Sequence, residues 1–221
     1  MTFLKRHWAI PLFVLVSIFF YSVPQFDMWV AGLFWQPDVG FELNENPIVQ
    51  FVYVVFRYMP HFLVPGLLIL LMLPWLKKSL QPSRKYSGFL LVVLLVGPGI
   101  IVHPILKDNW DRPRPRDIQQ FGGQAQFSPA FVMADEPGNN QSFASGHAAM
   151  GFFFMAFAWV FRQRRYLLGG LLIGAIVSLG RIVQGGHFVS DIVTAGFIVY
   201  FTCQVVGHYM LGHSRIKPDQ D

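Results

Sequence analysis

Long apolar segments separated by polar connections constrain this chain more than any other feature. A helix needs about 20 mostly apolar residues to cross the hydrocarbon core of a bilayer. The chain is 53% apolar and only 13% of its 221 residues are charged, against about 25% in an ordinary soluble domain. Six segments can be placed, at 8–23, 57–76, 86–106, 147–161, 166–183 and 189–211. We therefore predict an all-α fold, an integral membrane bundle of six transmembrane helices that forms one domain over residues 1–221.

The residues at the start of the first and second segments each allow two interpretations. The first follows Lys5-Arg6-His7, a pattern shared with secretory signal peptides. The stretch Val23-Pro24-Gln25-Phe26 offers no small-x-small cleavage site, which favours an uncleaved first transmembrane helix. Before the second segment, residues 47–58 have an amphipathic spacing. They suit either a helix that lies at the membrane interface or an early turn of a long span broken by Pro60 and Pro65.

The basic residues divide unequally between the two ends of the predicted spans. Eleven of the seventeen fall at one end: Lys5, Arg6, Lys77, Lys78, Arg84, Lys85, Arg162, Arg164, Arg165, Arg215 and Lys217. The other six are Arg57, Lys107, Arg112, Arg114, Arg116 and Arg181. Cytoplasmic loops collect Lys and Arg, so the positive-inside rule places the end with eleven basic residues, and both termini, in the cytoplasm.

Charge and cysteine content exclude two classes of protein. The net charge of +5 would suit nucleic-acid binding, but the basic residues flank apolar segments, as they do in membrane proteins. Cys203 is the only cysteine, so the chain has no intramolecular disulfide and no metal site built from cysteines. We expect Cys203 to be a small core or lipid-facing residue.

Three ionisable residues lie between and just inside the last two predicted spans: Arg181, His187 and Asp191. A His and an Asp four residues apart share one helix face, so the carboxylate can hold one imidazole nitrogen and leave the other free to attack. An arginine can grip a phosphate with its planar fork. Ionisable residues at a membrane boundary are costly and usually functional. The alternative is a structural Arg–Asp pair that closes the ends of two spans.

A second polar motif follows the third span, where Lys107 is followed by six residues and then Arg114. Pro113 and Pro115 fix an extended backbone around Arg114, which would present its guanidinium in a defined direction. Arg112 also precedes a proline, but only four residues separate it from Lys107. The alternative is a basic stretch that binds anionic lipid headgroups.

The third motif, Ser145-Gly146-His147, opens the fourth predicted span. Amides at a helix N-terminus point outward and form a ready phosphate site. The Ser145 hydroxyl can cap the helix, and Gly146 allows a close approach of the backbone. The alternative is an ordinary serine cap followed by a histidine at the membrane interface.

The order Lys-x6-Arg-Pro, Ser-Gly-His and Arg-x5-His-x3-Asp resembles the type 2 phosphatidic acid phosphatase superfamily, over about residues 90–195. The resemblance implies a membrane lipid phosphatase. It implies a substrate phosphate bound by Lys107, Arg114, Ser145, Gly146 and Arg181, and catalysis by His187, His147 and Asp191. Two positions depart from the family pattern. Ala144 stands where the family usually has proline, and Gly180 where it usually has serine, so one hydroxyl contact to phosphate is missing.

The resemblance also implies a mechanism. His187 would attack phosphorus and form a phosphohistidine while Asp191 orients the ring, and His147 would protonate the leaving group and then activate water. Three cationic side chains would already neutralise the phosphate, so we expect no metal and no other cofactor. The carboxylates of Asp108, Asp111 and Asp117 are scattered in a basic loop rather than clustered.

Lesser motifs look most like the bacterial lipid A 4′-phosphatase branch of the family: Gly97-Pro98-Gly99, Arg112-Pro113-Arg114-Pro115, Gln120-Phe121 and Gln184-Gly185-Gly186-His187-Phe188. This likeness implies the bacterial inner membrane, a site that faces the periplasm, and a lipid A-type substrate. Undecaprenyl pyrophosphate, phosphatidylglycerophosphate and phosphatidic acid are alternative substrates. A lipid phosphotransferase and a non-enzymatic membrane protein with an anion site are alternative functions.

The connection over residues 116–143 is unusually long. It is either a lid or recognition element, whose Gln and Asn side chains would bind a saccharide headgroup, or a loop that lies on the bilayer surface. The expected partners are the phosphorylated lipid and the bilayer, not nucleic acid, and the oligomeric state stays open.

Overall fold

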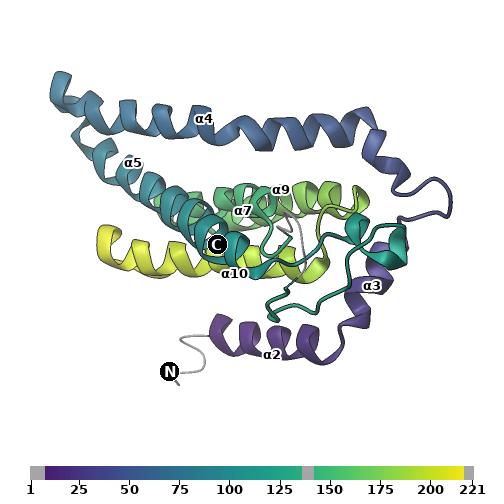
Figure 1. Ribbon diagram of the computed structural model, residues 1–221. Helices are drawn as coiled ribbons and strands as arrows, with labels where there is room; N and C mark the ends of the chain where they lie inside the picture. Colours follow the sequence, from purple (N-terminus) through teal and green to yellow (C-terminus); the bar gives the residue numbers. More distant parts are fainter. Residues whose placement is uncertain (1–7, 136–141, 217–221) are drawn as a thin grey trace.

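The computed structural model describes residues 8–135 and 142–216, and every regular element in these two ranges is a helix (Figure 1). The long elements are α2 (Ala9–Ser22), α3 (Gln25–Gly32), α4 (Pro47–Leu76), α5 (Gln81–Leu94), the π-helix η3 (Leu95–Lys107), α9 (Arg164–Val183) and α10 (Val189–Val206). The short ones are η1 (Glu42–Glu45), η2 (Lys78–Leu80), α6 (Asp108–Trp110), η4 (Pro115–Asp117), η5 (Gln119–Phe121), α7 (Gly146–Phe152), η6 (Phe153–Ala156), α8 (Phe157–Phe161) and the π-helical η7 (Gly207–Leu211). The all-α prediction is confirmed.

The number of membrane spans differs from the prediction of six. Four helical stretches are long and apolar enough to cross a bilayer: 47–76, 78–117, 164–183 and 189–211. A fifth span is reached if α2 and α3, which meet at an angle of 80°, count as one broken span. The fourth predicted span becomes the shorter apolar run Gly146–Phe161, divided among α7, η6 and α8. The prediction of a membrane bundle therefore holds, while a sixth full-length span is not found among the described residues.

Helix α4 decides between the two interpretations of residues 47–58. It begins at Pro47 and continues to Leu76, through Pro60 and Pro65, as one helix. Its start is fixed locally: the Asn46 side chain caps it by accepting a hydrogen bond from the Ile48 N–H at 2.9 Å, and proline is favoured at a first helical position. Residues 47–58 are therefore the early part of a long span and not a separate interfacial helix.

Small residues allow α9 to pack closely against the α7–η6 segment. A Cβ atom at Gly170 would lie 2.3 Å from the Met155 backbone nitrogen, and one at Gly174 would lie 2.1 Å from the Phe152 ring. Such contacts are typical of helix interfaces in membranes, where packing replaces the hydrophobic effect as the driving force. Cys203 is fully buried in the same core, which decides for the first of its two predicted environments.

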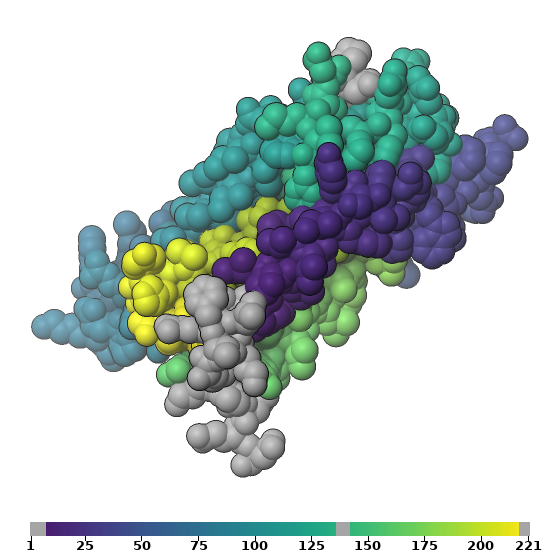
Figure 2. Space-filling view, turned by 90° about the horizontal axis from the view of Figure 1, so that it is seen from below, coloured from purple at the N-terminus to yellow at the C-terminus, as the bar shows by residue number. Residues whose placement is uncertain are grey.

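The N-terminal helices lie along α10, as the purple and yellow segments of Figure 2 show. Phe13 of α2 packs on Phe197 and Phe201, with ring centroids 5.1 and 5.7 Å apart. At the turn into α3 the chain reaches the end of the bundle where the connections 33–46 and 111–135 gather (Figure 1). This end also carries the N-terminus of α10, and the predicted site residues lie there.

Candidate active site

The end of η3 places Lys107 and the segment that follows it. Lys107 is the last residue of η3 and is only 9% exposed. The chain turns at Asp111, which has a positive φ of 45°, and then extends, with Arg114 at φ −81° and ψ 158°. This is the backbone that two flanking prolines predict. The Arg114 Nε atom is buried without a hydrogen-bond partner, so its guanidinium is available to a ligand.

Ser145 and Gly146 form a tight helix start. The Ser145 side chain caps α7 and accepts a hydrogen bond from the Ala148 N–H at 3.3 Å, as predicted. A Cβ atom at position 146 would lie 2.8 Å from the Nε2 atom of His103. A side chain there would displace His103, which explains the glycine at this position.

Arg181 lies at the end of α9 and is fixed on several sides. Its Nη1 donates to the Oε1 atom of Gln184, and its Cζ atom lies 4.8 Å from the centroid of the Tyr53 ring. Gly186 leaves room for the guanidinium, because a Cβ atom there would lie 2.2 Å from Nη2. The Nε atom is buried and unpartnered. Arg181 is thus held in place, and its Nε–H group can still donate a hydrogen bond to a ligand.

His187 is placed differently from the prediction. It lies in the turn before α10, which begins at Val189, so His187 and Asp191 do not share a helix face. The Nδ1 atom is 2.8 Å from the backbone carbonyl oxygen of Ser142 and 3.6 Å from the Oδ2 atom of Asp191. At these distances the Ser142 carbonyl is the hydrogen-bond partner of Nδ1, and Asp191 acts on the ring through its charge.

The environment of His187 keeps its ring neutral. The side chain is 1% exposed, and burial lowers the pKa of His187 to about 3, although the negative charge of Asp191 acts in the opposite direction. Arg181 and Lys107 lower the pKa further. With Nδ1–H donating to the Ser142 carbonyl, the neutral ring has its free lone pair on Nε2, as a nucleophile requires.

Asp191 is held by three donors. Its carboxylate accepts hydrogen bonds from Arg112 Nη1 at 2.5 Å, from the Ser142 hydroxyl at 2.6 Å and from the Phe188 N–H at 2.8 Å. Arg112 itself is fully buried against the Phe188 ring. Its guanidinium is occupied by carboxylates, a serine hydroxyl and a carbonyl. Of the two arginines that precede a proline, Arg114 is therefore the one available to a ligand, in agreement with the spacing from Lys107.

His147 completes the group. Its ring stacks on Tyr53 of α4, with centroids 4.6 Å apart and planes at 14°, and its Nε2 atom is buried without a partner. His147 lies within electrostatic range of Arg181, His187, Lys107 and Arg114. The structure thus brings the residues of the three motifs together at one end of the bundle.

Sequence reasoning missed Asp27, Tyr53, Ser142 and Ser190, which all contact these residues. Asp27 carried a signal that could have found it. It is an ionisable residue in the mostly apolar segment Gln25–Gly32, and such residues are usually paired or functional. Nothing in the sequence indicates that the Ser142 carbonyl would hold the histidine, because any residue supplies a backbone oxygen.

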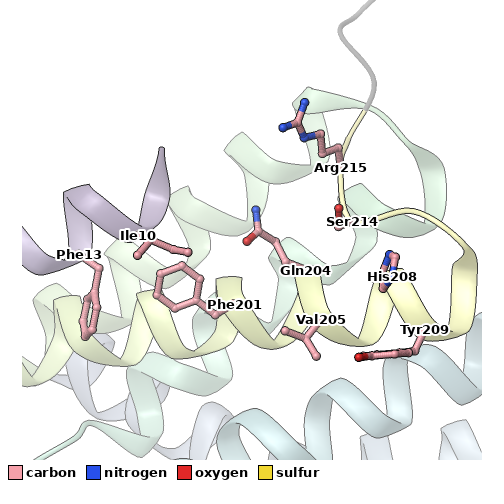
Figure 3. Close-up of a pocket in the computed structure, with 9 residues that line it drawn as sticks. All are labelled: Ile10, Phe13, Phe201, Gln204, Val205, His208, Tyr209, Ser214 and Arg215. Atoms are coloured by element: carbon pink, nitrogen blue, oxygen red, sulfur yellow. The ribbon is translucent and has the colours of Figure 1, made fainter. Parts of the chain in front are cut away.

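Two cavities clarify where a ligand would sit. One, of about 410 Å³, adjoins the site, since its lining includes Gln184, the partner of Arg181, together with Phe41, Glu42, Asn44 and Arg116. The other, of about 580 Å³, lies between α2 and the far end of α10 and is lined by Phe13, Phe201 and Val205 among others (Figure 3). The second is remote from all predicted site residues, so its volume does not make it the active site.

Comparison with known proteins identifies the family of this chain. The PAP2 superfamily, the type 2 phosphatidic acid phosphatase superfamily, matches residues 87–215, a range that contains every predicted site residue. A lipid A 4′-phosphatase of Francisella tularensis subsp. novicida is 35% identical over 195 residues, which cover 86% of this chain and 88% of that protein. Lipid A 4′-phosphatases of Rhizobium leguminosarum and Rhizobium etli are 37% and 38% identical over 103 and 108 residues, which cover 45% and 48% of this chain and 44% and 42% of those proteins. No solved structure matches. The chain belongs to the PAP2 superfamily.

Proposed function

We propose that this protein removes a phosphate from lipid A or a similar saccharide lipid at the periplasmic membrane face, through a phosphohistidine at His187 and without a metal. Family membership and the phosphatase relatives confirm the enzyme class, a phosphatase. The observation that carries the finer proposal is that Lys107, Arg114, Arg181 and His187 all lie within electrostatic range of His147. The Nδ1 atom of His187 is already engaged by the Ser142 carbonyl.

The first chemical step forms a nitrogen–phosphorus bond. The Nε2 atom of His187 attacks phosphorus in line, and the bond from phosphorus to the lipid oxygen breaks. Lys107, Arg114 and Arg181 hold the equatorial oxygens and balance their growing charge, with the Ser145–Gly146 helix start beside them. The negative charge of the bound phosphate offsets the cations around His147 and so favours its protonated form, which gives a proton to the leaving lipid oxygen.

The second step regenerates the enzyme. His147, now neutral, takes a proton from water, and the oxygen of that water attacks phosphorus. The nitrogen–phosphorus bond breaks and inorganic phosphate leaves. Asp191 stabilises the positive charge that the His187 ring carries between the two steps, from 3.6 Å away.

The cavity beside Arg181 supports a saccharide headgroup. Its lining carries Glu42, Asn44 and Glu45 together with the aromatic rings of Phe41 and Phe121. Hydroxyl-rich rings are bound by polar groups of this kind set among aromatic faces. Most of this lining comes from residues 39–45, whereas the prediction placed it in the 116–143 loop. Of that loop, Arg116 and Phe121 contribute, and Asn139, Asn140 and Gln141 lie outside the described residues.

The proposed orientation rests on the separation of charge along the bundle. Lys77, Lys78, Arg162 and Arg164 lie at connections at one end, and the site lies at the other. A reporter inserted after Gln163 should report the cytoplasm, and one inserted at Asp38 should report the periplasm. The reverse result would place the site on the cytoplasmic face.

The function is tested with purified protein in detergent and EDTA. The wild-type protein should release inorganic phosphate from lipid A, and the His187→Ala variant should release none. The His208→Ala variant, a matched change at the far end of the bundle, should be fully active. Appearance of a phosphorylated acceptor without free phosphate would instead indicate a phosphotransferase. Undiminished release by His187→Ala would refute the mechanism.

A paired substrate comparison tests the headgroup. Asn44→Ala and Glu42→Gln should raise KM for lipid A, because they remove hydrogen bonds to the saccharide. They should leave KM for a short-chain phosphatidic acid unchanged, because that substrate has no saccharide. Release from undecaprenyl pyrophosphate or phosphatidylglycerophosphate, with lipid A left untouched, would refute the lipid A assignment.

A further inference from the structure

A buried cluster of charges lies directly behind His187. Arg112 donates from Nη1 to Asp191 Oδ1 at 2.5 Å and from Nη2 to Asp27 Oδ2 at 2.9 Å, and all three side chains have no solvent exposure. Asp27 belongs to α3, outside the residues 87–215 that the family matches. The N-terminal segment of the chain therefore contributes a carboxylate to the rear of the site.

Donors from Arg112, from serine hydroxyls and from backbone N–H groups favour the ionised form of both carboxylates. Asp27 accepts from the Ser190 N–H at 3.0 Å, from the Ser190 hydroxyl and from Arg112. Asp191 accepts from Arg112, from the Ser142 hydroxyl and from the Phe188 N–H. Hydrogen bonds donated to a carboxylate stabilise its charged form. With both carboxylates ionised, the one guanidinium between them leaves the cluster a net charge of −1.

This net charge complements the reaction at His187. A buried, uncompensated charge is costly in a medium of low dielectric constant. When His187 attacks phosphorus, its ring becomes positively charged at 3.6 Å from Asp191, and the cluster together with the ring is then neutral. The cluster thus favours the charged ring over the neutral one, which is the condition for a contribution to rate rather than to substrate binding.

We propose that Asp27 and Arg112 are positioning residues of this active site. Arg112 holds the Asp191 carboxylate against His187, and Asp27 holds Arg112 from the opposite side and supplies the surplus negative charge. The inference rests on the proposed function, because it requires His187 to be the nucleophile. It gives α3 a role in positioning the active site, through Asp27.

The test uses Asp27→Asn, which keeps the shape of the side chain and removes its charge, with Asp38→Asn as the matched change at an exposed position of the same end. For lipid A in detergent micelles, Asp27→Asn should lower kcat about 10- to 100-fold, the effect of one charge-assisted hydrogen bond on a barrier. KM should stay unchanged, and Asp38→Asn should be fully active. The rate of phosphoenzyme formation should fall by the same factor as kcat.

A double variant separates positioning from mere structural support. If Asp27 acts through Asp191, Asp27→Asn/Asp191→Asn should be no slower than Asp191→Asn alone, because effects of residues that act as a unit do not multiply. Multiplicative losses, or an unchanged kcat in Asp27→Asn, would overturn the proposal.

Two controls keep the outcomes distinct. If His187→Ala retains activity, the proposed function fails and not only this inference. If Asp27→Asn does not fold, Ser190→Ala replaces it, since it removes one donor to Asp27 and one acceptor from Arg112. A smaller fall in kcat at unchanged KM would then support the proposal, and an unchanged kcat would overturn it.

Discussion

Gly186 lies against the guanidinium of Arg181, so a side chain at position 186 would displace the Arg181 side chain. A methyl group at position 186 would lie 2.2 Å from Arg181 Nη2 and 2.7 Å from Cζ. To restore ordinary contact at 3.4 Å the nitrogen must retreat by about 1.2 Å. A misplacement of about 1 Å in a catalytic group can cost 10²-fold in rate. We therefore expect Gly186→Ala to lower kcat/KM about 100-fold, equivalent to about 2.7 kcal/mol of transition-state stabilisation.

Gly180→Ala is the matched control for this prediction. Gly180 directly precedes Arg181 on α9, and a Cβ atom there meets nothing within 4 Å. Phosphate release from lipid A should be measured for both variants, together with the midpoint of thermal unfolding in detergent. Wild-type kcat/KM in Gly186→Ala, or an equal loss in Gly180→Ala, would refute the reasoning about Arg181.

Two further predictions concern α4 and the α9 interface. Tyr53 lies against both Arg181 and His147, so Tyr53→Ala should lower kcat/KM about 3- to 30-fold, the range of one cation–π contact. Tyr53→Phe keeps the ring and should remain near wild type in the same assay; equal losses in both variants would contradict this. Gly170→Ala brings a methyl group to 2.3 Å from the Met155 backbone nitrogen and should destabilise the fold by about 1–3 kcal/mol, seen as a lower thermal midpoint. Gly169→Ala, which meets nothing within 4 Å, should leave the midpoint unchanged or slightly raised, and a similar fall in both variants would contradict the packing argument.

The sequence predicted the helical membrane fold and the gathering of the three motifs because both depend on local patterns. Hydropathy marks the spans. The order of the three motifs and the spacings within them, such as Lys107 to Arg114 and Arg181 to His187, identify the family. The predicted first span ended at residue 23, next to Pro24, and the structure breaks there between α2 and α3. The 80° angle between the two helices is a tertiary property that the sequence did not predict. The Asp27–Arg112 contact joins residues 85 positions apart, and no local pattern encodes such a pairing.

The helix-face argument for His187 and Asp191 failed for a specific physical reason. It assumed that both residues belong to α10, but the Asp191 carboxylate accepts a hydrogen bond from the Phe188 N–H at the start of that helix. Asp191 thus caps the helix and leaves His187 outside it, where the Ser142 carbonyl holds the ring. The same two residues meet, but by capping rather than by helical periodicity.

The most direct measurement of the central claim is the capture of the phosphorylated enzyme. His147→Ala should slow the attack of water, while an activated aryl phosphate, which needs no protonation to leave, still phosphorylates His187. Rapid quenching with radiolabelled substrate should then give a protein-bound phosphate that is stable in alkali, labile in acid and located on His187. It should be absent from the His147→Ala/His187→Ala double variant. Label on another residue, or label that persists in the double variant, would contradict the account of His187 as the nucleophile.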